Sequence, residues 1–316
     1  MTEPQTRRRK RRKPKKKRTL KIIMAVILVL ILGVGAYAYS IWHSVEKTFT
    51  ETHEPLNRDV SEKRSEKVSF SKRDPISILL LGVDQRAGDR GRSDSLILMT
   101  LNPKDQSMKM VSIPRDTRTE IVGKGTTDKI NHAYAFGGVD MAVNTVEKFL
   151  DVPVDYYVQV NMESFKDIVD AVGGVTVNND LNFNYDGYSF KKGNLTLDGK
   201  EALAYSRMRK QDPRGDFGRQ MRQRQIIEGV IEEGASVQSL ANYGTILDTI
   251  GTNVRTNLTF DDMKQIQSNY KDARRNVEQL QVDGKSEKID GIYYYAVSDA
   301  TREALSSKLK QHLNIN

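Results

Sequence analysis

The stretch from Pro75 to Asp116 reads PISILLLGVDQRAGDRGRSDSLILMTLNPKDQSMKMVSIPRD, and it decides the fold. It holds three short aliphatic runs, Ile78–Val83, Leu96–Leu101 and Met108–Ile113, each bounded by Gly, Asn-Pro or Pro. Continuous apolar runs of this length between turn residues are typical of buried β-strands. The stretch therefore predicts three core strands that follow one another along the chain.

Charged side chains gather at the ends of these runs. They are Asp84, Arg86, Arg92, Asp94, Arg115 and Asp116. Paired carboxylates such as Asp84 and Asp94 suit a hard divalent cation, Mg²⁺ in the first place and Mn²⁺ as an alternative. Arginine suits phosphate oxygens, because its planar guanidinium donates two parallel hydrogen bonds. We therefore expect a metal-assisted site for a phosphorylated or pyrophosphorylated ligand.

Both pairs of residues also have a plainer interpretation. Two loop aspartates ten positions apart, such as Asp84 and Asp94, occur often by chance. Arg92 and Arg115 could form surface ion pairs, which contribute little to stability. Pro114 favours a functional role for Arg115, because a proline restricts the backbone before it and so helps to fix where the arginine points.

Composition and charge exclude several classes of protein. The chain of 316 residues has no cysteine, which excludes thiolate zinc sites, cysteine nucleophiles and disulfides. Residues 1–21 hold 12 of the 50 Lys and Arg but one of the 41 Asp and Glu, so this segment carries +11 and the rest −2. A nearly neutral body argues against a nucleic-acid partner.

The N-terminal region predicts a membrane anchor. Residues 1–21 form a basic tail, and Ile22–Tyr39 has no charge across 18 residues. At ~1.5 Å per residue this nearly spans a hydrocarbon core of about 30 Å, and residues up to Trp42 extend it. The positive flank keeps the tail in the cytoplasm, so the chain is a single-pass protein of the cell membrane with its body outside. A cleaved signal peptide ending at Ala36-Tyr37-Ala38 is the alternative, but the apolar run is long for one.

The rest of the chain divides into an extracellular stalk, residues 43–74, and one folded domain, residues 75–316. Periodicity predicts helices at Val139–Leu150, Met162–Val172, Asp198–Arg207, Asp216–Glu233, Leu240–Ile250 and Phe260–Tyr270, and a last helix capped by Ser298. Further strands are expected at Tyr156–Val160, Val175–Val177 and Ile292–Val297. This alternation indicates an α/β fold, a layered α-β-α domain with a central mixed sheet, preceded by one transmembrane helix.

A third polar group surrounds the start of the expected helix at Asp216. Its members are Arg207, Arg209, Asp216, Arg219 and Gln223. The last three have the spacing i, i+3 and i+7, so they share one helix face and are expected to line a groove. Arg222 and Arg224 fall on other faces, where we expect solvent. The plainer interpretation of the whole group is a solvated charged face.

Histidines and apolar residues carry weaker signals. His132 is a candidate general base or a structural histidine, whereas His43, His53 and His312 have the context of stalk or tail residues. Several apolar positions predict core, and some of them could also line a slot for a lipid chain. These are Val143, Val146, Ile168, Val169, Ile226 and Ile227.

Several motifs in a fixed order resemble the LytR–CpsA–Psr family, close to its teichoic-acid transferase branch. They are Leu80-Leu81-Gly82-Val83-Asp84, Gly91-Arg92-Ser93-Asp94-Ser95, Ser112-Ile113-Pro114-Arg115-Asp116, Lys129-Ile130-Asn131-His132-Ala133, Gly199-Lys200-Glu201-Ala202-Leu203-Ala204-Tyr205 and Asp216-Phe217-Gly218-Arg219-Gln220. The resemblance covers roughly residues 75–235. No single motif would be specific, but their order is.

The resemblance implies an activity and its partners. The family moves a glycopolymer phosphate from a polyprenyl-pyrophosphate carrier in the membrane lipid onto peptidoglycan, and releases polyprenyl phosphate. It implies that Asp84 and Asp94 bind Mg²⁺. It implies that the pyrophosphate lies among Arg92, Arg115, Arg207, Arg209, Asp216, Arg219 and Gln223. Catalysis would fall to Arg92 and Arg115, with Asp116 as a candidate base.

Two other functions are compatible with parts of the sequence. A non-catalytic module could hold a polyprenyl-pyrophosphate glycan or an anionic wall polymer with the same arginines, although it would not need the aspartate pair. A transcriptional regulator could use the basic tail to bind nucleic acid. A topology signal that contacts anionic lipids is the simpler role for that tail.

Overall fold

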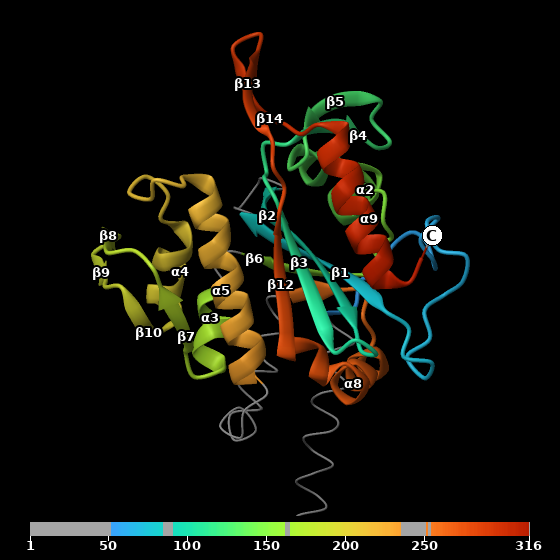
Figure 1. Ribbon diagram of the computed structural model, residues 1–316, viewed down its shortest axis with the longest axis horizontal. Helices are drawn as coiled ribbons and strands as arrows, with labels where there is room; N and C mark the ends of the chain where they lie inside the picture. The colour runs from blue at the N-terminus through green and yellow to red at the C-terminus, as the bar shows by residue number, and fades with distance from the viewer. Residues whose placement is uncertain (1–51, 85–90, 162–164, 235–250, 252–253, 316) are drawn as a thin grey trace, which may run out of the picture. The chain divides into compact units, whose positions relative to one another are not determined.

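The computed structural model describes residues 52–84, 91–161, 165–234, 251 and 254–315 (Figure 1). Its contacts divide the chain into Met1–Val45 and Glu46–Asn316, and every described residue belongs to the second unit. The predicted tail, anchor and Leu240–Ile250 helix, and Arg86, lie outside the described residues. Within the described part, no helix is long and apolar enough to cross a membrane.

A six-stranded sheet forms the centre of the second unit, and the three predicted strands are confirmed as its middle. Its spatial order is β11 (Val254–Thr256), β6 (Tyr156–Asn161), β1 (Ile76–Asp84), β2 (Arg92–Asn102), β3 (Ser107–Ile113) and β12 (Asn276–Gln281). The β1–β6 and β3–β12 pairs are parallel, and the β1–β2, β2–β3 and β6–β11 pairs are antiparallel. The sheet is therefore mixed, as expected.

Helices cover both faces of this sheet, which confirms the layered arrangement (Figure 1). Leu79, Leu81 and Leu98 point into a core shared with α2 (His132–Leu150) and α9 (Asp299–Leu313). Ile78 and Ile97 have the opposite parity and belong to a second core. Three further helices stand on that side with a third core of their own. They are α3 (Phe165–Ala171), α4 (Gly199–Arg207) and α5 (Asp216–Gly234).

Helix boundaries follow local capping chemistry. Asp198 accepts a hydrogen bond from the Glu201 N–H and begins α4, and Ser298 caps α9 as predicted. Helix α2 begins at His132, earlier than the predicted Val139, because a short helix joins the expected one at a kink. Gly138 sits in the kink with φ +66°, a conformation that favours glycine.

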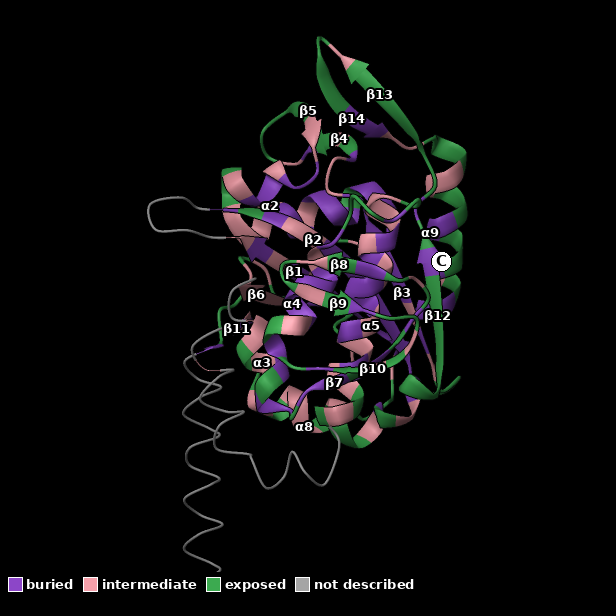
Figure 2. Ribbon diagram, turned by 90° about the vertical axis from the view of Figure 1, so that its left-hand side faces the viewer, coloured by how far each residue is buried: buried purple, intermediate pink, exposed green. Residues whose placement is uncertain are grey.

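Several exposed elements were not predicted. They are β4 (Arg118–Ile121), β5 (Thr126–Lys129), β8 (Phe183–Tyr185), β9 (Tyr188–Phe190), β10 (Gly193–Leu197), β12 and β13 (Lys285–Ile289). Strand β10 pairs with β7 (Val175–Asn179), and β13 pairs with β14 (Ile292–Ala296). Most residues of β12 and β13 are exposed (Figure 2), so these strands lack the apolar pattern by which strands are found. The remaining helix, α8 (Phe260–Asn269), matches its predicted position.

Residues 52–74, the described part of the expected stalk, lie against the body. Arg58 pairs with Glu147 on α2, and Arg64 forms a 2.6 Å ion pair with Asp155 at the start of β6. Arg64 and Asp155 are both more than nine-tenths buried. A buried ion pair of this kind fixes the position of the segment that carries it.

Candidate active site

A β-bulge brings the predicted aspartates to one end of the sheet. Gly82 pairs with Ser95 and Val83 with Ser93, so the register between β1 and β2 skips Asp94. Asp84 then faces Arg92 across the two strands. A bulge re-aims the side chain that it carries. Asp84, Arg92 and Asp94 therefore lie together where β1 ends and β2 begins.

Arg115 joins this group from the end of β3. Its Nη1 lies 3.0 Å from Asp94 Oδ1, and its Nε lies 3.8 Å from Asp116 Oδ2. Lys129 holds the other oxygen of Asp116 at 2.8 Å. Burial opposes the charged form of Arg115, but the attraction of Asp94 and Asp116 outweighs it and raises the Arg115 pKa. Arg115 therefore stays a cation inside a half-buried site.

The first turn of α5 supplies the second half of the site. Arg219 Nη2 lies 2.7 Å from Asp216 Oδ1, and Arg209 Nε lies 4.0 Å from the same oxygen. Gln220 donates to Asp216 Oδ2 at 2.9 Å. Burial lowers the Arg219 pKa, and the positive charge of Arg115 acts in the same direction. The charges in the two halves of the site therefore interact. We call Asp94, Arg115, Arg209, Asp216 and Arg219 the arginine–aspartate cluster.

Arg207 and Gln223, two other predicted residues, flank this cluster. Arg207 ends α4, two residues before Arg209. Gln223 follows Arg219 by one turn of α5 and reaches the wall of an apolar cavity of about 90 Å³. The cavity lies between the sheet and α3–α5, and is lined mainly by Leu80, Leu81, Ile97, Val158, Val160, Phe165 and Ile227. An apolar cavity thus adjoins the cluster.

The positions that sequence analysis offered for a lipid slot divide between core and cavity. Ile227 lines the apolar cavity. Val143 and Val146 instead belong to the core under α2, on the other face of the sheet. Val169 and Ile226 lie in the core of the α3–α5 layer. Periodicity gives the buried face of each helix, but it does not tell which buried side chains leave a space between them.

The prediction that Arg222 and Arg224 face solvent is wrong. Arg222 is fully buried, and it donates from Nη1 to Asp212 Oδ2 at 2.6 Å and from Nη2 to the Met208 carbonyl at 2.6 Å. Arg224 is 8% exposed and donates to Ser112 Oγ on β3. Helix α5 packs against α4 on one side and approaches the sheet on the other, so its polar residues are enclosed. Buried polar side chains are tolerated when they are hydrogen-bonded in this way.

Asp212 is the residue that sequence reasoning missed. Its carboxylate accepts hydrogen bonds from Arg222 and Arg214, and its side chain is fully buried. Burial would raise the Asp212 pKa, but these two arginines outweigh it and hold that pKa well below its usual range. Gly218, a glycine inside the predicted helix, was a sign in the sequence that another group approaches closely there. A Cβ at this position would lie 1.9 Å from Asp212 Oδ2, so the close approach needs glycine.

The histidines have two distinct environments. His132 Nδ1 lies 2.7 Å from Asp128 Oδ2. The preceding residue, Asn131, donates a hydrogen bond from Nδ2 to Asp94 Oδ1 at 3.4 Å. Hydrogen bonding to His132 outweighs the effect of burial and lowers the Asp128 pKa. The expectation that His312 is a tail residue is wrong. It is buried, and its ring nitrogens lie within hydrogen-bonding distance of the Thr100 and Ser107 hydroxyls.

The metal hypothesis can be compared with the donors present. Among the described residues, no group of three or more His, Cys, Asp or Glu could hold a metal ion. Asn131 Oδ1, beside Asp94, is buried without a hydrogen-bond partner in the described part of the chain. Mg²⁺ commonly uses one or two carboxylates and takes its other ligands from water and phosphate. Asp84 and Asp94 fit such a shared ion, and do not fit an ion enclosed by protein ligands alone.

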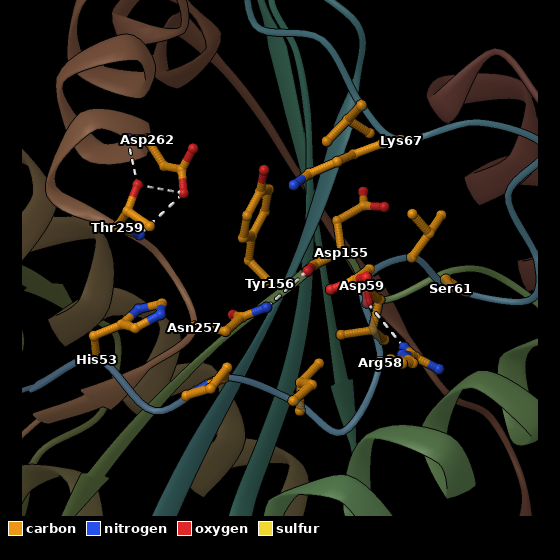
Figure 3. Close-up of a pocket in the computed structure, with 15 residues that line it drawn as sticks. His53, Arg58, Asp59, Ser61, Lys67, Asp155, Tyr156, Asn257, Thr259 and Asp262 are labelled. Carbon is orange, nitrogen blue, oxygen red and sulfur yellow. Dashed lines mark hydrogen bonds between the residues drawn. The ribbon is translucent and has the colours of Figure 1, made fainter.

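A second pocket, of about 210 Å³, lies at the opposite end of β1 and β6 (Figure 3). Residues of the stalk segment form one wall, and Lys67 and the Tyr156 hydroxyl point into the space. Three of its other charged groups already have partners: Arg58 pairs with Glu147, Asp155 pairs with Arg64, and Asp262 takes part in the N-cap of α8. The pocket is therefore the polar seam along which the stalk segment packs, and it is separate from the arginine–aspartate cluster.

Comparisons with known proteins agree with the motifs. The model of the LytR_cpsA_psr family matches residues 39–311. A Bacillus cereus polyisoprenyl-teichoic acid–peptidoglycan teichoic acid transferase TagU is 61% identical over 282 residues, 89% of this chain and 93% of the relative. The crystal structure of Bacillus subtilis TagU has 55% identity and a TM-score of 0.64, covering 76% of this chain and 97% of that one.

A further solved structure carries a ligand. It is the family protein YwtF (TagT) with a bound octaprenyl pyrophosphate lipid, which is 32% identical with a TM-score of 0.67. The match covers 83% of this chain and all of that one. With a family model over most of its length and relatives at this identity, the chain belongs to the LytR_cpsA_psr family, within its TagU-like branch.

Proposed function

We propose that this protein transfers a glycopolymer of the teichoic-acid class from a polyprenyl-pyrophosphate carrier to peptidoglycan, and releases polyprenyl phosphate. One observation carries the proposal: the arginine–aspartate cluster adjoins an apolar cavity. A ligand with a charged head and an apolar chain needs a charged site and an apolar cavity side by side. The name of the Bacillus cereus relative and the lipid in the TagT structure support it.

The pyrophosphate would lie between the two halves of the cluster. Arg115 and Arg219 are each paired with a carboxylate, so both guanidinium groups are oriented before a ligand arrives. Arg219 Nε is buried without a hydrogen-bond partner among the described residues. Leaving such a donor unsatisfied costs about 1–3 kcal/mol, which a phosphate oxygen would recover. Arg92, Arg207 and Arg209 add positive charge at the rim.

The prenyl chain would enter the apolar cavity beside Gln223. The cavity wall is made of aliphatic and aromatic side chains from the sheet and from α3 and α5. Each CH₂ group removed from water contributes about 0.8 kcal/mol. A cavity of about 90 Å³ accommodates only a short part of such a chain, so it would select for the lipid end next to the pyrophosphate.

We propose Mg²⁺ as the cofactor, held by Asp84 and Asp94, with Mn²⁺ as the alternative. The ion would neutralise pyrophosphate charge and polarise a phosphoryl oxygen. Asp94 also pairs with Arg115, so the same carboxylate places the arginine next to the metal position. The protein side chains would hold the two positive groups, the metal ion and Arg115, at one end of the sheet.

In the transfer step a peptidoglycan hydroxyl attacks phosphorus, and the bond to the polyprenyl phosphate breaks. Arg92 and Arg115 would stabilise the charge that passes to the leaving phosphate. Asp116, fixed by Lys129, is the first candidate to accept the hydroxyl proton. His132 is the second, because its pairing with Asp128 through Nδ1 leaves Nε2 for the proton.

We also propose that residues 22–42 anchor the protein and that residues 43–316 lie outside the cell. The support is the uncharged run behind a positive tail. A lipid-linked donor is confined to the membrane, so an enzyme tethered there meets it at the surface.

The test uses the full chain in detergent with Mg²⁺, a prenyl-pyrophosphoryl glycan and peptidoglycan strands. We expect release of prenyl phosphate together with a mass gain on the acceptor, and loss of both in Arg115→Ala. Arg275→Ala is the matched control, because Arg275 is exposed and pairs with Asp272 away from the cluster. Tight donor binding without release, in every combination of donor and acceptor, would instead support the binding module.

A further inference from the structure

The hairpin of β13 and β14 stands out from the body of the second unit (Figures 1 and 2). Four of the five residues of β13 are exposed, and so are the first two of β14. Ile292 is 50% exposed and Tyr293 is 39% exposed, and both are among the few large apolar side chains left open in the described residues. Single exposed apolar side chains are common on protein surfaces, so the groups around Tyr293 decide whether the hairpin is an interaction surface.

The base of this hairpin is bonded to both halves of the candidate active site. The Tyr295 N–H donates to the Asp116 carbonyl at 2.9 Å. The Tyr295 ring packs edge-on against Phe217, with centroids 5.8 Å apart, and Phe217 follows Asp216 on α5. Strand β14 therefore runs from the hairpin tip inward, and its inner end lies next to the arginine–aspartate cluster. Tyr293 is two residues further out, about 7 Å along the strand.

Cations lie beside the exposed ring. Lys129 Nζ is 5.8 Å from the Tyr293 ring centroid and also binds Asp116. Arg118 lies over the ring of Tyr294, the next residue. On the outer face, Lys288 is the cross-strand partner of Tyr293. We call Lys129, Lys288 and Tyr293 the hairpin platform: one flat ring and two cations. Ile292 precedes Tyr293 on β14, so its side chain points to the opposite face of the hairpin.

We propose that the hairpin platform binds the acceptor, a peptidoglycan glycan strand, and guides its hydroxyl to the cluster; this inference rests on the proposed function. A tyrosine ring offers a flat apolar face to a sugar ring and a hydroxyl for its polar edge. The two lysines complement the carboxylates of the peptides that a peptidoglycan strand carries. The platform continues directly from the site where the acceptor must react.

The same features fit other occupants poorly. A stable protein interface buries roughly 1,200–2,000 Å² in total with an apolar centre, whereas the platform offers one apolar ring between two cations. The hairpin carries Lys285 and Lys288 but also Glu287 and Asp290, so it lacks the run of positive charge that binds an anionic membrane. A polar polymer with rings and carboxylates matches the mixture.

The test measures transfer by the full chain in detergent, with the acceptor and the donor varied in separate series. In Tyr293→Ala we expect the KM for peptidoglycan strands to rise about tenfold, the effect of losing one stacking contact and its buried area. The KM for the donor should change less than twofold. Tyr293→Trp should restore the acceptor KM, because it keeps a flat ring. Val277→Ala removes a similarly exposed apolar side chain from β12 and is the control.

Direct binding keeps this inference separate from the proposed function. Purified glycan strands are sedimented with the full chain, and Tyr293→Ala and Lys288→Ala should each lower the bound fraction at a fixed strand concentration. If wild type shows no transfer but binds strands through Tyr293, the proposed function fails and the platform stands. An unchanged acceptor KM, unchanged sedimentation, or a Tyr293-dependent dimer in analytical ultracentrifugation would overturn the platform.

Discussion

Arg222 Nη1 and Asp212 Oδ2 lie 2.6 Å apart, and neither side chain is exposed to solvent. Arg222 also donates to the carbonyls of Tyr205 and Met208, which flank Arg207 at the end of α4. One buried arginine thus ties α5, which carries Arg219, to the segment that carries Arg207 and Arg209. The pair sets the distance between arginines that would bind the pyrophosphate.

Breaking this pair should destabilise the protein. Removing one partner of a buried ion pair costs about 3–5 kcal/mol, because the other charge is left uncompensated. We therefore expect Asp212→Asn to lower the free energy of unfolding by several times as much as Asp180→Asn, which removes a half-exposed carboxylate from Arg214. Urea unfolding followed by circular dichroism measures both. Equal effects in the two variants would show that Arg222 does not depend on Asp212.

Arg219 is expected to act mainly on donor binding. Its side chain is 12% exposed, and its guanidinium would donate hydrogen bonds to the pyrophosphate, one of them from the buried Nε. Arg219→Lys keeps the charge but loses the two-pronged geometry, so the donor KM should rise at least tenfold. Isothermal titration with a prenyl pyrophosphate, using Arg275→Lys as the control, measures the loss. Undiminished affinity in Arg219→Lys would place the pyrophosphate elsewhere.

Chelation should distinguish the roles of the two aspartates from those of the arginines. We expect EDTA to abolish transfer and Mg²⁺ to restore it, with Mn²⁺ as a partial substitute. Asp84→Asn and Asp94→Asn should each raise the Mg²⁺ concentration needed for half-maximal rate. Mn²⁺ binding followed by electron paramagnetic resonance gives a readout that does not depend on turnover. A metal requirement that is the same in both variants and wild type would contradict the assignment.

The pH dependence of transfer should identify the base. If His132 takes the proton, His132→Gln should abolish the acid limb of the kcat profile. If Asp116 takes it, that limb should disappear in Asp116→Asn instead. Rate profiles of the two variants and wild type from acid to alkaline pH separate the cases. A limb that survives in both variants would exclude both residues.

His312 should make stability sensitive to mild acid. Burial lowers its pKa from the usual value, with Lys109 acting in the same direction, so the folded state favours the neutral ring. The unfolded state then binds more protons as the pH falls below about 6.5, and this contribution to stability, complete above that pH, is lost on acidification. Thermal unfolding between pH 7.5 and 5 should show a smaller decline for His312→Gln than for wild type.

A matched surface histidine tests that assignment. His53 is exposed and contacts the Leu258 carbonyl, so His53→Gln should keep the wild-type slope of melting temperature against pH. If His312→Gln and wild type lose stability in parallel on acidification, another group carries the effect.

Much of the sheet and of the charged cluster could be predicted because local patterns encode them. Three aliphatic runs, Ile78–Val83, Leu96–Leu101 and Met108–Ile113, are buried on both faces of the sheet. Continuous apolar runs of this length are typical of such strands, so they can be recognised from the local sequence. Pro114 before Arg115, and the i, i+3 spacing of Asp216 and Arg219, likewise act within a few residues.

Local patterns of residues were thus enough to predict the central strands, most helices and the family motifs. Which charges meet depends on how distant segments pack together. Asp94 reaches Arg115 only because β2 and β3 pair, and Arg222 is buried only because α5 lies against α4. Strand β14 was predicted from its apolar pattern, but β13 lacks one, so the hairpin and its place beside Asp116 could not be foreseen. Burial of polar groups depends on partners far away in the chain, and no local pattern records them.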